Sequence, residues 1–175
     1  MLNGPIPPYV DPRKLADRGA TLEGVSAVSA FERFSAQLVE NTGDVHARIE
    51  FERDELGAVV MRSVLDTEVR MICQRCLEVA ELPVHAENVY VVVREGANTQ
   101  SVPKAYDALE LGEEPLDLLT LVEDELLLAL PIVPVHDPEV CQQPAGLDEP
   151  EPSEGEVSKP NPFSVLAQLK RDPNG

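Results

Sequence analysis

Tryptophan is absent from this 175-residue sequence, and aromatic residues make up only 4% of it. A hydrophobic core must therefore be built from Val, Leu, Ile and Ala, and a hydrophobic content of 43% is sufficient for one. Long apolar runs are also missing, because the longest, from Leu126 to Val135, is broken by Pro131 and Pro134. A membrane helix needs about 20 apolar residues, so we expect none, and the first ten residues have no features of a secretory signal.

Positive charge and cysteine are both scarce. The chain has 14 Lys and Arg against 32 Asp and Glu, which gives a formal net charge of -18. This balance argues against bulk electrostatic binding to nucleic acid or anionic membranes, and it permits a basic protein partner. Three cysteines, an odd number, suit a reducing cytoplasm better than a disulfide framework. We therefore expect a cytoplasmic protein.

Composition divides the chain into three predicted parts. Residues 1–141 are expected to form an α+β domain, and residues 142–160, rich in Pro and Glu, an acidic disordered linker. Residues 161–175 are predicted to form a short C-terminal helix that begins near Pro162. Its apolar side is expected either to bind a partner or to fold back on its own domain; the side chains on it are Phe163, Leu166 and Leu169.

Hydrophobic periodicity indicates the elements of the folded part. Apolar and polar residues alternate over 45–52, and strand-rich runs follow over 59–71 and 77–94, joined by short turns. These segments favour an antiparallel β meander. A period of three to four residues predicts a short helix over 31–39 and a longer one from Asp117 to Pro131. The expected fold is therefore an antiparallel meander with one or two packed helices.

Two pairs of metal-ligating residues stand out. Cys73 and Cys76 form a C-x-x-C turn at the end of a predicted strand, and His136 and Cys141 follow the proline-rich segment. Three cysteines and one histidine are the ligands of a closed tetrahedral zinc site, so a structural zinc ion is one hypothesis. Two alternatives stay open: Cys73 and Cys76 are a buried thiol and a turn residue, or they form a redox pair.

Other polar clusters give weaker signals. Glu123, Asp124 and Glu125 are consecutive on the predicted helix, which indicates a solvated helix face rather than a catalytic pair. No phosphate-binding loop or nucleophile motif is recognisable, so we expect a non-enzymatic protein with no small-molecule substrate. A basic face for RNA is possible if the strands align the four arginines that lie in or next to the predicted sheet, which are Arg62, Arg70, Arg75 and Arg94.

Several sequence blocks resemble a known family. They are Cys73–Cys76, Pro103–Tyr106, Leu121–His136 and the segment from Lys159 through Phe163 to Leu166. In this order the blocks are similar to those of the YceD family, bacterial proteins needed for accumulation of large-subunit ribosomal RNA. The resemblance covers roughly residues 70 to 171. It implies a role in synthesis, processing or stability of 23S rRNA, and it implies no catalytic residues.

Charge and resemblance together suggest how such a protein would act. The leading hypothesis is a ribosome-biogenesis factor whose acidic surface contacts a basic ribosomal protein or another assembly factor. The alternatives are a module that binds large-subunit rRNA directly through the arginine-bearing sheet face, and a zinc-stabilised scaffold associated with RNA. A metal-dependent nuclease or RNA-modifying enzyme is a further possibility, but it would need an open metal position.

Overall fold

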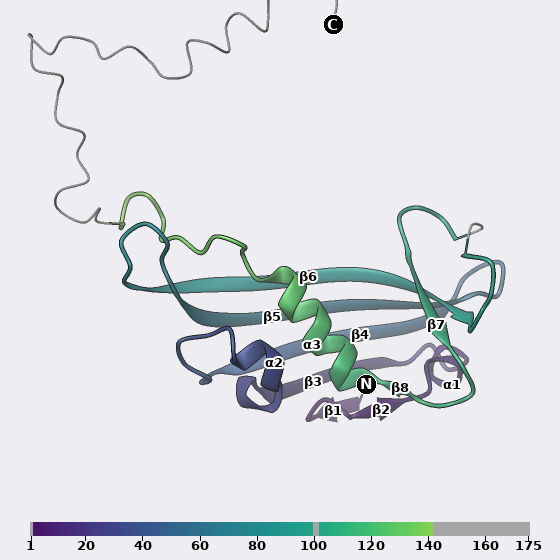
Figure 1. Ribbon diagram of the computed structural model, residues 1–175. Helices are drawn as coiled ribbons and strands as arrows, with labels where there is room; N and C mark the ends of the chain where they lie inside the picture. Colours follow the sequence, from purple (N-terminus) through teal and green to yellow (C-terminus); the bar gives the residue numbers. More distant parts are fainter. Residues whose placement is uncertain (1, 100–101, 142–175) are drawn as a thin grey trace, which may run out of the picture. The chain divides into compact units, whose positions relative to one another are not determined.

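The computed structural model describes residues 2–99 and 102–141, and most of its strands form one mixed six-stranded sheet (Figure 1). The order across this sheet is β1-β3-β4-β5-β6-β7. Its strands are β1 (Leu2–Gly4), β3 (Thr21–Ala27), β4 (Asp44–Arg53), β5 (Val59–Ile72), β6 (Val79–Arg94) and β7 (Asp107–Leu111). A separate two-stranded sheet pairs β2 (Tyr9–Val10) with β8 (Leu116–Asp117). The helical segments are α1 (Pro12–Ala16), the 3-10 turn η1 (Val28–Ala30), α2 (Glu32–Ser35) and α3 (Leu118–Ala129).

The predicted meander is confirmed in the centre of the sheet and is wrong at its edges. Strands β3, β4, β5 and β6 pair antiparallel in sequence order. The edge strands β1 and β7 instead pair parallel with β3 and β6. A parallel pair needs a long connection, and both connections are long: residues 5–20, which contain β2 and α1, lie between β1 and β3, and residues 95–106 lie between β6 and β7. The α+β class holds, with a mixed rather than a purely antiparallel sheet.

Alternation along β4 places its apolar side chains on one face of the sheet, as predicted. Val45, Ala47, Ile49 and Phe51 are buried, whereas the intervening side chains point to the opposite face. The two long strands β5 and β6 continue the same two faces across the sheet. The sheet therefore has one apolar face for a core and one polar face.

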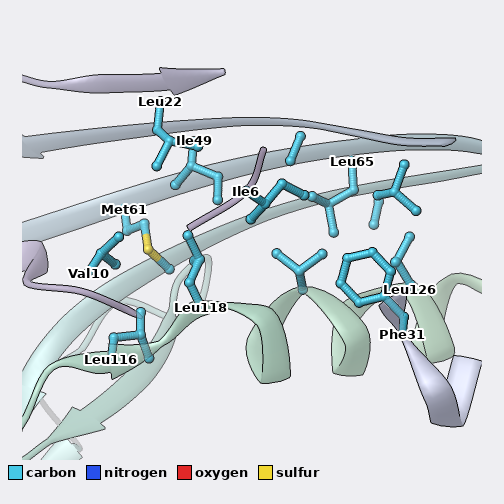
Figure 2. Packing of buried hydrophobic residues seen from close by; sticks show 14 of the residues in the cluster. Ile6, Val10, Leu22, Phe31, Ile49, Met61, Leu65, Leu116, Leu118 and Leu126 are labelled. Atoms are coloured by element: carbon cyan, nitrogen blue, oxygen red, sulfur yellow. The ribbon is translucent and has the colours of Figure 1, made fainter. Parts of the chain in front are cut away.

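Helix α3 covers the apolar face, which it crosses diagonally in Figure 1. Its buried residues Leu118, Val122 and Leu126 recur every four positions and so lie on one side of the helix. In Figure 2, Leu118 and Leu126 point toward the sheet. Each such side chain contributes about 1.5–3 kcal/mol by leaving water. The predicted start of this helix at Asp117 is confirmed, since Asp117 is its N-cap: its carboxylate accepts a hydrogen bond from the Thr120 N–H at 3.0 Å.

The first half of the chain departs from the prediction. The helix expected over 31–39 is limited to α2, because the Val39 N–H donates to the Arg70 carbonyl and draws the following loop alongside β5. The chain between β1 and β3 contains β2 and then α1, which Pro12 opens behind an Asp11 N-cap. Strand β3 was not predicted at all.

Two further predictions concern membrane helices and the chain end. Within residues 2–99 and 102–141, no helix is long and apolar enough to cross a membrane. The predicted linker 142–160 and the predicted helix 161–175, with Phe163, Leu166 and Leu169, lie outside the described residues.

Candidate metal centre

The first two candidate ligands sit in the tight turn that joins β5 to β6. The Cys73 N–H donates to the Glu78 carbonyl at 2.8 Å, and the Leu77 N–H donates back to the Cys73 carbonyl at 2.9 Å. Leu77 has a φ of 65°, the one positive φ of a non-glycine side chain in the described ranges. The left-handed conformation costs an L residue about 1–2 kcal/mol. The turn maintains this strain while it presents Cys76 next to Cys73.

The other two candidate ligands come from the loop after α3. Helix α3 ends at Ala129, before Pro131, and the chain then runs past the β5–β6 turn, where the Gln74 N–H donates to the Pro134 carbonyl at 2.8 Å. Further on, the Asp137 carbonyl accepts the N–H of Cys141 at 3.0 Å. This turn reverses the chain and brings Cys141 back toward the β5–β6 turn.

The four side chains meet at one point. Their ligand atoms all lie within 4.8 Å of one another. The Cys73 and Cys141 sulfurs are 3.8 Å apart, and the Cys76 sulfur is 3.2 Å from His136 Nδ1. Zn–S bonds of about 2.3 Å in a tetrahedron give an S–S separation of about 3.8 Å. The Cys73–Cys141 separation is therefore that of two sulfurs on one tetrahedral ion, and it is far longer than a disulfide bond.

Hydrogen bonding orients the histidine for this role. His136 Nε2 lies 3.0 Å from the Val79 carbonyl oxygen, which can only accept a hydrogen bond. Nε2 therefore carries the proton, and in the neutral ring the lone pair is on Nδ1, the nitrogen nearest the cysteines. A metal-binding histidine commonly donates its second N–H to such an acceptor.

Backbone N–H groups prepare the buried Cys73 sulfur for a negative charge. The N–H groups of Arg75 and His136 both lie 3.4 Å from Cys73 Sγ. Burial alone would raise the pKa of the Cys73 thiol, but the N–H groups of Cys76, His136 and Arg75 outweigh it and lower the pKa to about 5. The thiolate is the form that binds metal, so this donor set fits a soft or borderline cation.

The arrangement can hold a metal ion but leaves no coordination position for a substrate. Four protein ligands complete a tetrahedron, as in structural zinc sites, whereas catalytic sites keep one position open. An ion here would join the β5–β6 turn to the loop after α3. The sequence singled out all four residues as candidate ligands, and the fold brings them together.

The four candidate RNA-binding arginines do not share one surface. Arg62 and Arg70 lie on the polar face of β5, where they pair with Glu52 (3.3 Å) and with Glu40 and Glu81 (2.9 and 2.5 Å). Arg75 lies in the β5–β6 turn, and Arg94 falls four residues after the buried Tyr90, on the other side of β6.

Two of the three consecutive carboxylates of α3, Glu123 and Glu125, are not on the solvated face that the sequence suggests, whereas Asp124 is half exposed. Glu123 has a side chain that is only 12% exposed, and it accepts hydrogen bonds from the N–H groups of Arg33 (2.7 Å) and Phe34 (3.2 Å). It thereby caps α2, whose own N-cap residue Phe31 provides no side-chain bond. Glu125 is half-buried and accepts hydrogen bonds from Asn88 and Tyr90 of β6. The periodicity of α3 gave no signal for these partners, which are distant in sequence.

Comparison with known proteins identifies a family and a relative of this chain. The profile of a family described as large ribosomal RNA subunit accumulation protein YceD matches residues 61–170. A curated protein of that name from Haemophilus influenzae is 35% identical over 168 residues, which cover 95% of this chain and 97% of the relative. No solved structure matches the chain. The profile covers more than half of the sequence and the relative nearly all of it, so this chain belongs to the YceD family.

Proposed function

We propose that this chain is a non-enzymatic ribosome-biogenesis factor that supports the accumulation of 23S rRNA by contacting proteins rather than by coating the RNA. The name of the Haemophilus influenzae relative refers to accumulation of the large ribosomal RNA subunit and to no reaction. The partner would be a basic ribosomal protein or another assembly factor, held on the acidic surface.

The observation that carries this proposal is that many basic side chains are already paired within the chain. Six of them already form ion pairs with carboxylates of the same chain: Lys14, Arg33, Arg48, Arg53, Arg62 and Arg70. The Arg13 guanidinium donates instead to the carbonyls of Leu111 and Gly112. Phosphate contacts require available Lys or Arg, and a chain of net charge -18 has few to offer.

Direct RNA binding is tested with protein-free 23S rRNA over a range of salt concentrations. We expect weak binding that weakens further with salt, because few phosphates would be neutralised. Sub-micromolar affinity at physiological salt would contradict the proposal. Substituting Arg62, Arg70 and Arg94 together by Gln would then test the arginine-based alternative, which requires a uniform loss of RNA binding.

We also propose that Cys73, Cys76, His136 and Cys141 hold one structural zinc ion. The support is the ligand set, the 3.8 Å sulfur spacing and the orientation of His136 by Val79. The ion would supply stability and no chemistry. Metal analysis of protein purified without chelator should give about one equivalent of zinc. Less than about a tenth of an equivalent, with three freely titratable thiols in the folded protein, would exclude a stable zinc site.

A further inference from the structure

The polar face of the sheet, opposite α3, carries a continuous shallow groove. Four neighbouring hollows share lining residues: the first two share His46 and Asp66, and the second and third share Gly43 and Glu68. The third and fourth share Arg70 and two glutamates, and the fourth ends at His136 of the metal centre. The hollows therefore follow β5 from the level of Val64 to the metal-binding loop.

The dimensions of the groove fit an extended chain. Between Val64 and Ile72 a strand rises about 26 Å, the length of about eight residues of extended peptide. Val25 and Val140, which are 44% and 69% exposed, lie in the first and last hollows and offer apolar contact at both ends. The middle of the groove is polar.

Charge decides which kind of chain would bind. The arginines that line the groove are already paired, Arg48 with Glu23 and Glu50, and Arg70 with Glu40 and Glu81. The remaining carboxylates make the groove negative; they are Asp44, Asp66, Glu68 and Asp137. Of these, Asp44 and Glu68 form no side-chain hydrogen bond or ion pair with the described residues, although both line the second hollow.

We propose that this groove binds an extended, Lys/Arg-rich segment of a protein, with cations directed at Asp44 and Glu68. In an extended peptide, alternate side chains point to the same side, so a cation at every second position would face the carboxylates. A phosphate backbone would meet the same carboxylates with repulsion. The inference rests on the proposed function and names the surface that the basic partner would occupy.

The test uses a fluorescent peptide of alternating Lys and Ser, about ten residues long, and the full-length protein. The double variant Asp44→Asn/Glu68→Gln should bind this peptide at least about tenfold more weakly. The matched control Glu113→Gln/Glu114→Gln removes the same charge from exposed positions outside the groove and should change affinity by less than about twofold. A Glu-Ser peptide should not bind. Equal thermal midpoints of the two variants would show that the fold is unchanged.

Several outcomes would overturn the groove assignment. Equal weakening by both double variants would mean that net charge alone attracts the peptide, and no binding at all would exclude a basic ligand. Binding of a single-stranded RNA oligonucleotide to the unsubstituted protein, in competition with the basic peptide, would identify RNA as the occupant. A dimer in sedimentation experiments that only the groove variant dissociates would identify a second copy of the chain.

The same variants separate this inference from the proposed function. Both are tagged and recovered from cells, and the proteins that survive RNase treatment are compared. If the groove variant keeps the RNase-resistant partners, the groove is wrong and the proposed function stands. If the unsubstituted protein has no such partners, the proposed function itself fails.

Discussion

At the scale of single residues, the carboxylates of α3 hold the helices and the sheet together. Glu123 joins α3 to α2, and Glu125 joins α3 to β6. They are two residues apart, yet their environments shift their pKa values in opposite directions. Their substitution should therefore give opposite dependences of stability on pH.

Glu123 should stabilise the fold at neutral pH. Burial alone would raise the pKa of Glu123, but hydrogen bonds from Arg33 and Phe34 outweigh burial and hold this pKa below 4.5. The stabilisation is therefore complete above pH 4.5 and is lost as the pH falls through the lower folded-state pKa. Glu123→Ala should lower the free energy of unfolding by about 1–3 kcal/mol at pH 7 in urea denaturation, because two N–H groups lose their acceptor.

The neighbouring Asp124 provides the control for Glu123. Its side chain is 50% exposed and also pairs with Arg33, so Asp124→Ala should cost less than about 1 kcal/mol. Equal losses for the two variants would mean that Glu123 acts as a surface charge and not as the cap of α2.

Glu125 should show the reverse pH dependence. Burial raises the pKa of the Glu125 carboxyl, and the hydrogen bond from Asn88 compensates only in part. The folded protein then binds the proton more tightly than the unfolded chain, so this group's contribution rises as the pH falls from neutral through the raised pKa. Glu125→Gln should gain stability relative to the unsubstituted protein at neutral pH and lose that advantage near pH 4.5. A difference that is independent of pH in urea denaturation would refute this account.

At the scale of elements, the β1–β3 edge of the sheet depends on a close contact between Gly24 of β3 and Ile6. A Cβ on Gly24 of β3 would lie 2.9 Å from Ile6 Cγ1 and 3.1 Å from the Ile6 backbone nitrogen. Gly24→Ala should therefore displace the chain after β1 and cost about 1–3 kcal/mol in thermal unfolding. In Gly112→Ala the added Cβ would meet Glu95 at an ordinary 3.5 Å. If this control costs as much, the loss reflects glycine itself and not the contact with Ile6.

The order of the loop after α3 should depend on the proposed zinc ion. His136→Ala should lower the zinc content and destabilise the protein by about 2 kcal/mol or more, because the ion binds the folded state. Hydrogen exchange should become faster in residues 136–141 while α3 keeps its protection. His85→Ala is the control, since His85 pairs with Asp66 on the exposed face (2.7 Å) and lies outside the cluster. Equal effects of the two variants on zinc content would argue against the proposed ligand set.

The sequence indicates these elements only where the signal is local. Alternation over 45–52 was sufficient to predict β4, and the helical period that begins at Asp117 was sufficient to predict the start of α3. The parallel pairing of the edge strands was not predictable from the sequence. The pairing of β1 with β3, for example, depends on a crossover connection and not on hydrophobic periodicity. The candidate metal centre was predictable only in part. The ligand types and their spacing could be read from the sequence, but the approach of the two pairs depends on a tertiary contact, the hydrogen bond from Gln74 to Pro134. That Arg94 lies on the other side of β6 could be known only from the register of the β5–β6 pair.

At the scale of the whole molecule, the charge is the property that relates the fold to its proposed function. Most basic side chains of the sheet form ion pairs with carboxylates of the same chain. The polar face also has carboxylates that have no partner among the described residues. Such a surface attracts basic proteins and repels phosphate. The YceD family is named for accumulation of large-subunit ribosomal RNA, and an indirect route through proteins reconciles that name with a charge of -18.

The most direct test of this indirect route is an affinity purification of the tagged protein from cells, divided into RNase-treated and untreated halves. The account predicts that large-subunit proteins or assembly factors stay bound after RNase treatment, since the contacts are between proteins. Release of every partner together with the RNA would contradict it and would make the arginines of the sheet the surface to examine.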